Sequence, residues 1–248
     1  MSDELELLPG VPEDYVRVRL SAAGGKEIES GKFTSPDSSA ALAVNAFAWF
    51  HQQPELLPSI PGTEAAGWPP ERVEIEYCVR FPWSGGRHPW LDAFVETATY
   101  IIGVESKRHE PFRDAKHVSL SEAYDRPVWG KRMGPYEAMR DQLRSGGTRF
   151  LHLDAAQLVK HALGLFTEAS RRARKDPILV YLYAEPSCWR ADAIARHRDE
   201  VVAFTRTMDG AAVRFTPVRW RDWLATWTVQ DNAALAAHRQ RLTERFDL

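Results

Sequence analysis

The alternation of hydrophobic and polar positions along the chain predicts helices and strands in a regular order. "SPDSS" at 35–39 is typical of a helix start, because Asp or Ser side chains accept free amide hydrogens there. The following "AALAVNAFAWFH" is apolar on nearly every side, which predicts a buried helix. "RVEIEYCVRF", from Arg72 to Phe81, alternates polar and apolar residues and predicts a half-buried strand. Two further strands are expected at about 89–97 and 100–107.

The second half of the chain repeats this alternation of helix and strand. A helix is expected over about 154–171, with an apolar stripe formed by Ala155, Leu158, Val159, Ala162 and Phe166. A short apolar strand is expected at 178–183, a helix at about 191–208 and a strand near 213–218. Residues 1–35 are expected to form a loosely ordered extension, and 36–248 one domain with an insertion near 108–150. This order predicts an α/β protein whose mixed sheet is flanked by helices on both faces.

Composition adds little except an uneven distribution of charge. The 248 residues are 44% hydrophobic and 27% charged, which is ordinary for a globular protein, and the net charge is -2. Residues 1–75 contain five basic and twelve acidic side chains, a net charge of -7, so the remainder has +5. The bases in that remainder are mostly arginine, which suits bidentate contacts to phosphate. An ordinary solvated surface is the alternative explanation.

The cysteines and the apolar segments exclude several classes of protein. Cys78 and Cys188 are the only cysteines and neither belongs to a C-x-x-C pair, so a disulfide framework and a zinc finger are excluded. The longest apolar stretch, from Ala40 to Phe50, is too short to span a bilayer. The acidic start has no signal-like apolar segment. A cytoplasmic protein without a membrane partner is expected.

Charged residues stand in an unexpected place in "PWLDAFVETATYIIGVESK", from Pro89 to Lys107. If Ala98 and Thr99 form the turn of an antiparallel hairpin, Asp92 lies opposite Glu105, with Cβ atoms roughly 5 Å apart. Lys107 is two residues beyond Glu105 and shares its face. Two carboxylates this close repel each other unless a cation lies between them, and Mg²⁺ or Mn²⁺ fits such oxygen ligands. The alternative is an ion pair on a solvent-facing sheet.

The same stretch resembles the signature of the PD-(D/E)XK nuclease superfamily, which has the restriction-endonuclease-like fold. Pro89 and Asp92 resemble its PD element loosely, with two residues between them, and Glu105-Ser106-Lys107 resembles its E-x-K element. The superfamily's core order of helix, three strands, helix and strand is the order predicted for residues 38–183. A bacterial group of restriction-endonuclease-like proteins is more similar still. It shares the serine-led first helix with an Asn, the "VESK" strand followed by an acid, and a "QL..H" second helix.

This resemblance implies a metal-dependent nuclease that hydrolyses phosphodiester bonds, with DNA as the expected substrate. It implies that Asp92 and Glu105 bind Mg²⁺ or Mn²⁺, with the Ser106 carbonyl as a third ligand. Lys107 would orient or help to deprotonate the attacking water and offset charge on the phosphate, while the metal lowers the pKa of that water. The expected partner is therefore nucleic acid. The oligomeric state is left open between monomer and homodimer.

The sequence departs from the superfamily pattern in its first helix. Many members use a glutamate from this helix, but here its one strongly polar interior residue is Asn45, either a satisfied core amide or a site residue. Glu64, Glu74, Glu76 and Glu96 are candidate replacements, and no spacing rule selects among them. The departure puts a second metal ion in doubt.

Polar residues after the hairpin are further candidates for a supporting role. Gln157 precedes Lys160, His161 and Gly164 by three, four and seven residues, so all four share one helical face, opposite the apolar stripe. Gln157 could reach the site and Lys160 a phosphate, or this face could be solvated. His161 is expected to be a hydrogen-bonded surface or core histidine rather than a ligand. Glu110 could flank the site or stand near it by chance.

Two other functions remain open alongside the nuclease. The first is the same fold with weakened catalysis, acting as a module that binds nucleic acid or a protein partner. The missing acid in the first helix favours this module, and the intact Asp92, Glu105 and Lys107 favour the nuclease. The second is an α/β protein with a chance E-x-K that acts in protein interaction. Loss of Mn²⁺ binding on changing both Asp92 and Glu105 to Ala would exclude the chance match.

Overall fold

A mixed sheet lies at the centre of the computed structural model, which describes residues 5–23, 31, 33–35, 37–172, 175–227 and 232–248. Within these residues the sheet has five strands in the order β1-β2-β3-β4-β5. They are β1 Arg72–Cys78, β2 Trp90–Glu96, β3 Tyr100–Lys107, β4 Asp176–Tyr183 and β5 Arg214–Arg219. The first three strands pair antiparallel, and β3, β4 and β5 pair parallel.

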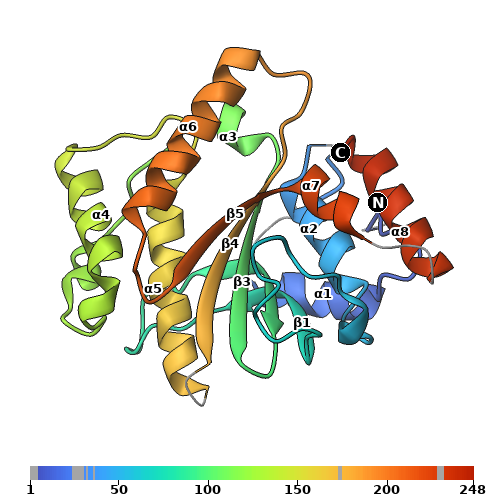
Figure 1. Ribbon diagram of the computed structural model, residues 1–248, viewed down its shortest axis with the longest axis horizontal. Helices are drawn as coiled ribbons and strands as arrows, with labels where there is room; N and C mark the ends of the chain where they lie inside the picture. Colours follow the sequence, from blue (N-terminus) through green and yellow to red (C-terminus); the bar gives the residue numbers. More distant parts are fainter. Residues whose placement is uncertain (1–4, 24–30, 32, 36, 173–174, 228–231) are drawn as a thin grey trace.

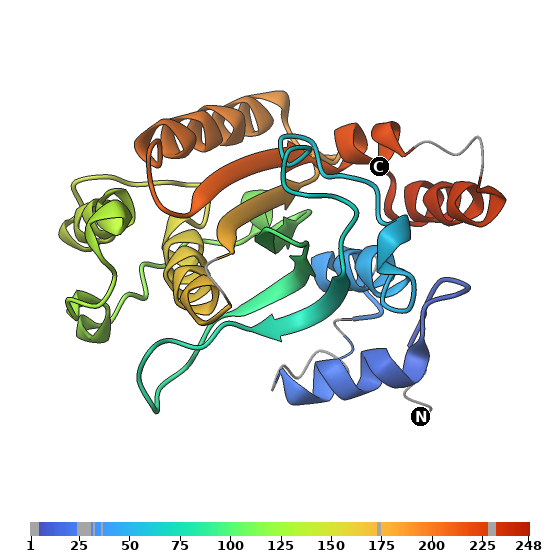
Figure 2. The same cartoon turned by 60° about the horizontal axis from the view of Figure 1, so that its bottom comes forward.

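Helices cover both faces of this sheet (Figure 1). The face with α2 also has α1, α7 and α8, and the opposite face has α4, α5 and α6, as Figure 2 shows after rotation. The helices are α1 Glu13–Ala22, α2 Ser39–Ala48, α3 Glu110–Arg113, α4 Gly134–Ser145, α5 Ala155–Arg171, α6 Ala191–Thr207, α7 Trp220–Thr226 and α8 Ala233–Phe246, with short 3₁₀ turns at Pro54–Leu56, Glu122–Asp125 and Lys131–Met133. None of the described helices has the length and apolar character needed to cross a membrane.

The elements predicted from residue patterns are present with nearly the expected boundaries. Helix α2 begins after Ser38, whose side chain accepts a hydrogen bond from the Ala41 amide at 3.1 Å. The helix is buried on all sides, as its apolar sequence predicts, because it packs on β1, β2 and β3 and against α8. The predicted mixed sheet with helices on both faces is confirmed.

The expectation of loose order is wrong for residues 13–22, which form helix α1. Val16 and Leu20 are buried in the core shared with α2, and the Tyr15 hydroxyl accepts a hydrogen bond from the Ile75 amide at 3.1 Å. Arg19 binds the carbonyls of Ile75 and Glu76 at 2.9 and 2.6 Å. Only Val16 and Leu20 of this helix are buried, so its sequence has too weak an apolar periodicity to predict a helix. Polar contacts attach the helix to the sheet. The domain boundary near residue 35 stays a prediction.

The region 108–150, expected as a polar insertion, contains an amphipathic helix. Tyr136, Met139 and Leu143 of α4 are buried against the α5 side of the core, and the Tyr136 hydroxyl donates to the Val213 carbonyl at 3.1 Å. Helices α7 and α8 were also not predicted separately. The tryptophans of the C-terminal segment, Trp220 and Trp223, are buried in the core shared with α2.

The alternation of side chains between the two faces of the sheet is interrupted at Glu76 on β1 and at Asp92 on β2. Before this point on β1, Ile75 packs in the α2 core, and so does its partner Ala93. Beyond it, Val79 and Leu91 pack in the α5 core. Glu76 adopts a positive φ of 44°, which is uncommon for a residue other than glycine and re-aims the chain. The change places Asp92 at the point where the two strands bend.

A histidine in the core makes stability depend on pH. His238 of α8 is buried, with its ring stacked on Trp49 at a centroid distance of 4.8 Å. Burial lowers the pKa of His238 to about 4. The unfolded chain therefore takes up a proton on this residue below about pH 6.5, whereas the folded chain stays neutral until about pH 4.

We therefore expect His238 to cost stability as the pH falls. The free energy of unfolding should drop by about 2 kcal/mol between pH 7 and pH 5 through this residue alone. Urea titrations of wild type and His238→Phe at both pH values measure the difference. The variant should lose less stability than wild type, whereas His117→Phe, at an exposed position, should behave as wild type. Equal pH dependence in wild type and His238→Phe would contradict the assignment.

Candidate active site

The hairpin β2–β3 brings Asp92 and Glu105 to the same place. The observed pairs Ala93–Val104 and Val95–Ile102 have the predicted register, and the Thr97 amide donates to the Tyr100 carbonyl across the turn Ala98-Thr99. The paired ladder stops at Ala93–Val104, one position before Asp92 and Glu105. From there the Asp92 side chain replaces the backbone of β2, because its Oδ2 accepts a hydrogen bond from the Ser106 amide at 2.6 Å.

Glu105 is a buried carboxylate with a basic group on each oxygen. Its side chain is only 2% exposed. Oε1 pairs with the Lys107 ammonium, and Oε2 lies 3.0 Å from Nδ1 of His161 on α5. Burial alone would raise the pKa of Glu105, but the attraction of Lys107 and His161 outweighs it and lowers the pKa to about 2. Glu105 is therefore ionised at neutral pH despite its burial.

Asp92 has the opposite balance. Its pKa is raised well above the ordinary value, first by burial and then by repulsion from Glu105 and Glu76. Lys107 and the Ser106 amide act in the other direction without offsetting this. Burial and the neighbouring acids together outweigh Lys107 and favour the protonated form of Asp92.

Lys107 is a fixed cation at the end of β3. Burial would lower the pKa of its ammonium, but the charges of Glu105, Asp92 and Glu110 raise it above its ordinary value. Lys107 is therefore protonated at neutral pH and can act as an electrostatic group beside the carboxylates. As a charged ammonium it has no lone pair with which to take a proton from water.

Among the acids considered as replacements for the missing first-helix glutamate, Glu76 lies nearest in the sheet to Asp92. The pairs Ile75–Ala93 and Tyr77–Leu91 flank it, so Glu76 is across from Asp92, and its charge raises the pKa of Asp92. Its backbone carbonyl is held by Arg19 of α1. No sequence pattern indicates this contact, because Arg19 lies in the segment without a predicted element.

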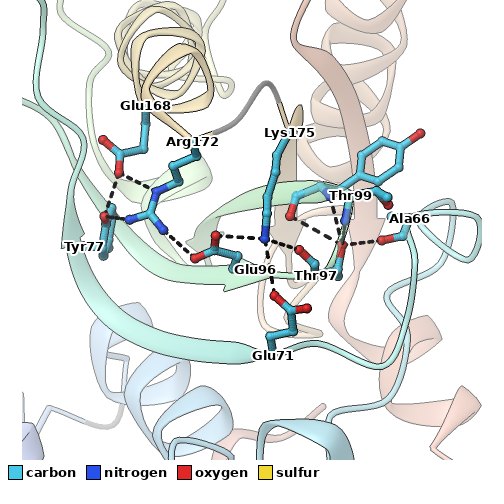
Figure 3. A network of polar contacts seen from close by, with 10 residues as sticks. Ala66, Glu71, Tyr77, Glu96, Thr97, Thr99, Glu168, Arg172 and Lys175 are labelled. Carbon is cyan, nitrogen blue, oxygen red and sulfur yellow. Dashed lines mark hydrogen bonds and ion pairs between the residues drawn. The ribbon is translucent and has the colours of Figure 1, made fainter.

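Other acids of that group lie elsewhere. Glu96 is at the far end of β2, where it pairs with Arg172 and with Lys175 at 3.0 Å in the network of Figure 3. Glu74 pairs with Arg72 and Arg19, and Glu64 accepts from the Gly62 amide. The carboxylates of these three acids therefore bind neighbouring side chains or backbone amides away from Asp92.

Asn45 also lies away from the candidate site. It is buried in α2, where its Oδ1 accepts from the Leu8 amide at 2.7 Å and its Nδ2 donates to the Ala41 carbonyl at 2.8 Å. Of the two alternatives, the structure therefore shows a satisfied core amide. Asn45 attaches the N-terminal segment to the first helix.

Glu110 lies beside Lys107 at the start of α3. Its carboxylate accepts from the Ser39 hydroxyl of α2 and from the Arg108 amide, the latter at 3.0 Å. Its charge also contributes to the raised pKa of Lys107. Glu110 joins the end of β3 to the start of α2, and it borders the candidate site.

The polar face of α5 packs toward this site and is not an ordinary solvated face. His161 and Gly164 are buried, and Gln157 and Lys160 are half-buried. A Cβ on Gly164 would lie 2.7 Å from Cγ2 of Val79 and 3.0 Å from Cγ of Pro89, so only glycine permits this approach. The expectation that His161 is a hydrogen-bonded core histidine agrees with its burial, but its partner, Glu105, was not foreseen.

Two cavities lie next to the residues that contact Glu105 and meet at α5. One, of about 190 Å³, is lined by Lys107, Glu110, Gln157 and Tyr181, among others. The other, of about 630 Å³, is lined by Trp90, Gln157, Lys160 and His161, among others. Tyr181 was not predicted as a site residue, because the parallel pairing that sets it beside Glu105 cannot be derived from local sequence. Gln157 borders both cavities.

The number of carboxylates at this site fits a hard divalent cation. Mg²⁺ commonly binds to one or two carboxylates and keeps water or phosphate as its other ligands. Asp92 and Glu105 supply two such carboxylates, and a cation would relieve the repulsion between them that, after burial, raises the pKa of Asp92. Among the described residues, no three Asp, Glu, His or Cys side chains form a metal-binding group. The site therefore suits a cation shared with water or substrate, rather than a cage made by the protein alone.

Comparison with protein families agrees with this geometry. The family model described as "Restriction Endonuclease associating with ARP" (REase-ARP) matches residues 4–246. The chain belongs to this family. The predicted restriction-endonuclease-like assignment is thereby confirmed, and the REase-ARP chain has the mixed sheet flanked by helices expected of that fold. Searches of curated proteins and of solved structures found no significant match.

Close packing at Gly164 predicts the effect of a single methyl group in this REase-ARP protein. Gly164→Ala should destabilise the fold by about 1–3 kcal/mol, because α5 must move away from Val79 and Pro89. Urea unfolding measures this difference. Ser170→Ala, at an exposed position of the same helix, should stay within about 0.5 kcal/mol of wild type. A Gly164→Ala protein as stable as wild type would show that α5 is not held tightly against the site.

Proposed function

We propose that this protein is a metal-dependent nuclease that hydrolyses phosphodiester bonds in DNA. The observation that supports it most is the set of Asp92, Glu105 and Lys107 at one end of β2 and β3, with an ionised Glu105 and a protonated Lys107. Membership of a restriction-endonuclease family supports nuclease activity. Metal dependence and the choice of DNA are proposals that rest on the chemistry of these side chains.

In this proposal each residue has a distinct task. Asp92 and Glu105 would hold Mg²⁺ or Mn²⁺, with the Ser106 carbonyl as a further oxygen ligand. A bound metal supplies a water of lowered pKa and draws charge from the phosphate. Lys107 would position that water and stabilise the negative charge that develops on the phosphate, which suits an ammonium that stays protonated.

Neighbouring residues would hold these groups in place. His161 would fix the orientation of Glu105 through Oε2, and Lys107, which lines the smaller cavity, contacts Oε1. The Ser106 amide fixes Asp92. Glu76 is the acid best situated to assist Asp92, although its side chain lies on the neighbouring strand β1. With Asp92 and Glu105 as its two carboxylate ligands, the site would hold one metal ion.

Removal of Lys107 should abolish cleavage. Wild type with Mn²⁺ is expected to nick supercoiled plasmid, and Lys107→Ala should be slower by at least about a hundredfold, the usual loss when a preorganised electrostatic group is removed. Gel assays with and without EDTA measure this. Lys131→Ala changes an exposed lysine outside the site and should cleave as wild type does.

The opposite outcome would support the alternative function. If neither wild type nor any variant cleaves plasmid, single-stranded DNA or RNA with Mg²⁺ or Mn²⁺, autonomous nuclease activity is excluded under those conditions. The absence of a first-helix acid then favours a module that uses this fold to bind nucleic acid or a protein partner.

Metal binding can be tested separately from cleavage. Calorimetric titration should show Mn²⁺ binding to wild type and its loss in the double variant Asp92→Asn/Glu105→Gln, whose side chains keep their size but lose the charges that favour a cation. The control Glu122→Gln/Asp209→Asn changes two exposed acids and should bind as wild type. Mn²⁺ binding that survives in the first double variant would place the metal elsewhere.

The family's description also suggests a protein partner. It names association with ARP, and we propose that this chain acts together with such a protein. Cleavage that occurs only when an ARP protein is added would support a partner-dependent nuclease. A nuclease fully active alone would limit the partner to targeting or regulation.

A further inference from the structure

The larger of the two cavities has features that the cleavage chemistry does not use. It has a volume of about 630 Å³ and lies between the start of β2, helix α5 and the chain segment that leads to α4. His161 and Gln157 form part of its wall, so it opens directly beside Glu105 and beside the cavity that contains Lys107. A substrate bound at the carboxylates would therefore extend into it.

The lining of this cavity combines basic and aromatic side chains. Lys160 and Arg87 have no ion-pair partner among the described residues, although both line the cavity. Trp90 and Tyr124 supply aromatic rings. Asp154 is the carboxylate of this lining, and its Oδ1 already accepts the Gln157 amide at 2.9 Å as the cap of α5. The cavity thus offers cations for phosphate and a ring surface for a base.

We infer that this cavity binds an unpaired nucleotide next to the cleaved phosphate, so that the substrate strand is single at this point. Grooves that bind single strands combine positive side chains along the backbone with aromatic rings that stack on bases. Inside a duplex each base is stacked on both faces, so no face is free to stack on Trp90. The volume also matches a pocket for a small ligand rather than a channel for a duplex. This inference rests on the proposed function, which brings the phosphate to Asp92 and Glu105.

The position of Gln157 between the two cavities indicates the path of the strand across the site. The smaller cavity, with Lys107 and Lys116 on its wall, meets the larger one at Asp154 and Gln157. A strand crossing Gln157 would have the scissile phosphate at Lys107 and the next nucleotide at Lys160 and Trp90. Because the Glu105 side chain is almost fully buried, an unpaired strand reaches the carboxylates more easily than a stiff duplex.

The inference is tested by binding, without cleavage. Fluorescence anisotropy in EDTA compares a labelled single-stranded 12-nucleotide DNA with the same sequence as a duplex. Wild type should bind the single strand at least tenfold more tightly. Trp90→Leu should weaken single-strand binding by about tenfold, the usual effect of losing one stacking ring, and Trp90→Phe should restore most of it. Lys160→Met should weaken binding and lower the slope of log K against log salt by about 0.7.

Matched controls separate the cavity from the rest of the surface. Lys131→Met changes an exposed lysine that does not line the cavity, and it should bind as wild type. Circular dichroism shows whether each variant is folded. Equal or tighter binding of the duplex, or unchanged single-strand binding in folded Trp90→Leu and Lys160→Met, would overturn the inference.

The same proteins distinguish this failure from failure of the nuclease. If wild type cleaves with Mn²⁺ but Trp90 and Lys160 do not affect binding, the proposed function stands and the cavity is not a nucleotide site. If single strands bind through Trp90 and Lys160 but nothing is cleaved, the cavity is a nucleotide site in a binding module.

Discussion

The ionised carboxylate of Glu105, buried between Lys107 and His161, is the interaction on which the rest of the site depends. A charge is costly to bury unless it is paired and hydrogen-bonded. Here Lys107 on the same strand supplies the opposite charge, and the His161 ring on α5 contacts the second oxygen. The pairing sets the distance between the sheet and α5, which Gly164 keeps short. Asp92 is buried beside this ionised carboxylate, and a cation bound here would relieve the repulsion between the two acids.

The backbones of β1 and β2 both depart from regular strand geometry beside this arrangement. On β1, Glu76 adopts a positive φ and Arg19 holds its carbonyl. On β2, the ladder to β3 ends at Ala93, and the Asp92 side chain takes the hydrogen bond of the Ser106 amide. Both changes occur at the same level of the sheet. They interrupt a continuous antiparallel ribbon beside Glu105, whose two contacts Lys107 and His161 each line one of the two cavities.

The sequence was sufficient for the parts that depend on local pattern. The turn at Ala98-Thr99 predicted the register that the pairs Ala93–Val104 and Val95–Ile102 show, and the observed ladder ends one position before Asp92 and Glu105. The contact of His161 with Glu105 could not be predicted, because it depends on how α5 crosses the sheet. Helix α1 was missed because only Val16 and Leu20 mark its buried side. That Glu76, among the four acids, lies across from Asp92 could be found only from the strand register.

We propose that Asp92 and Glu105 form a metal site in a nuclease of the REase-ARP family. Anomalous X-ray diffraction from crystals soaked in Mn²⁺ tests this directly. An anomalous peak is expected within coordination distance of a carboxylate oxygen of both Asp92 and Glu105. A well-ordered hairpin with no peak there, in crystals where Mn²⁺ binds at another position or not at all, would show that these two side chains do not form the metal site.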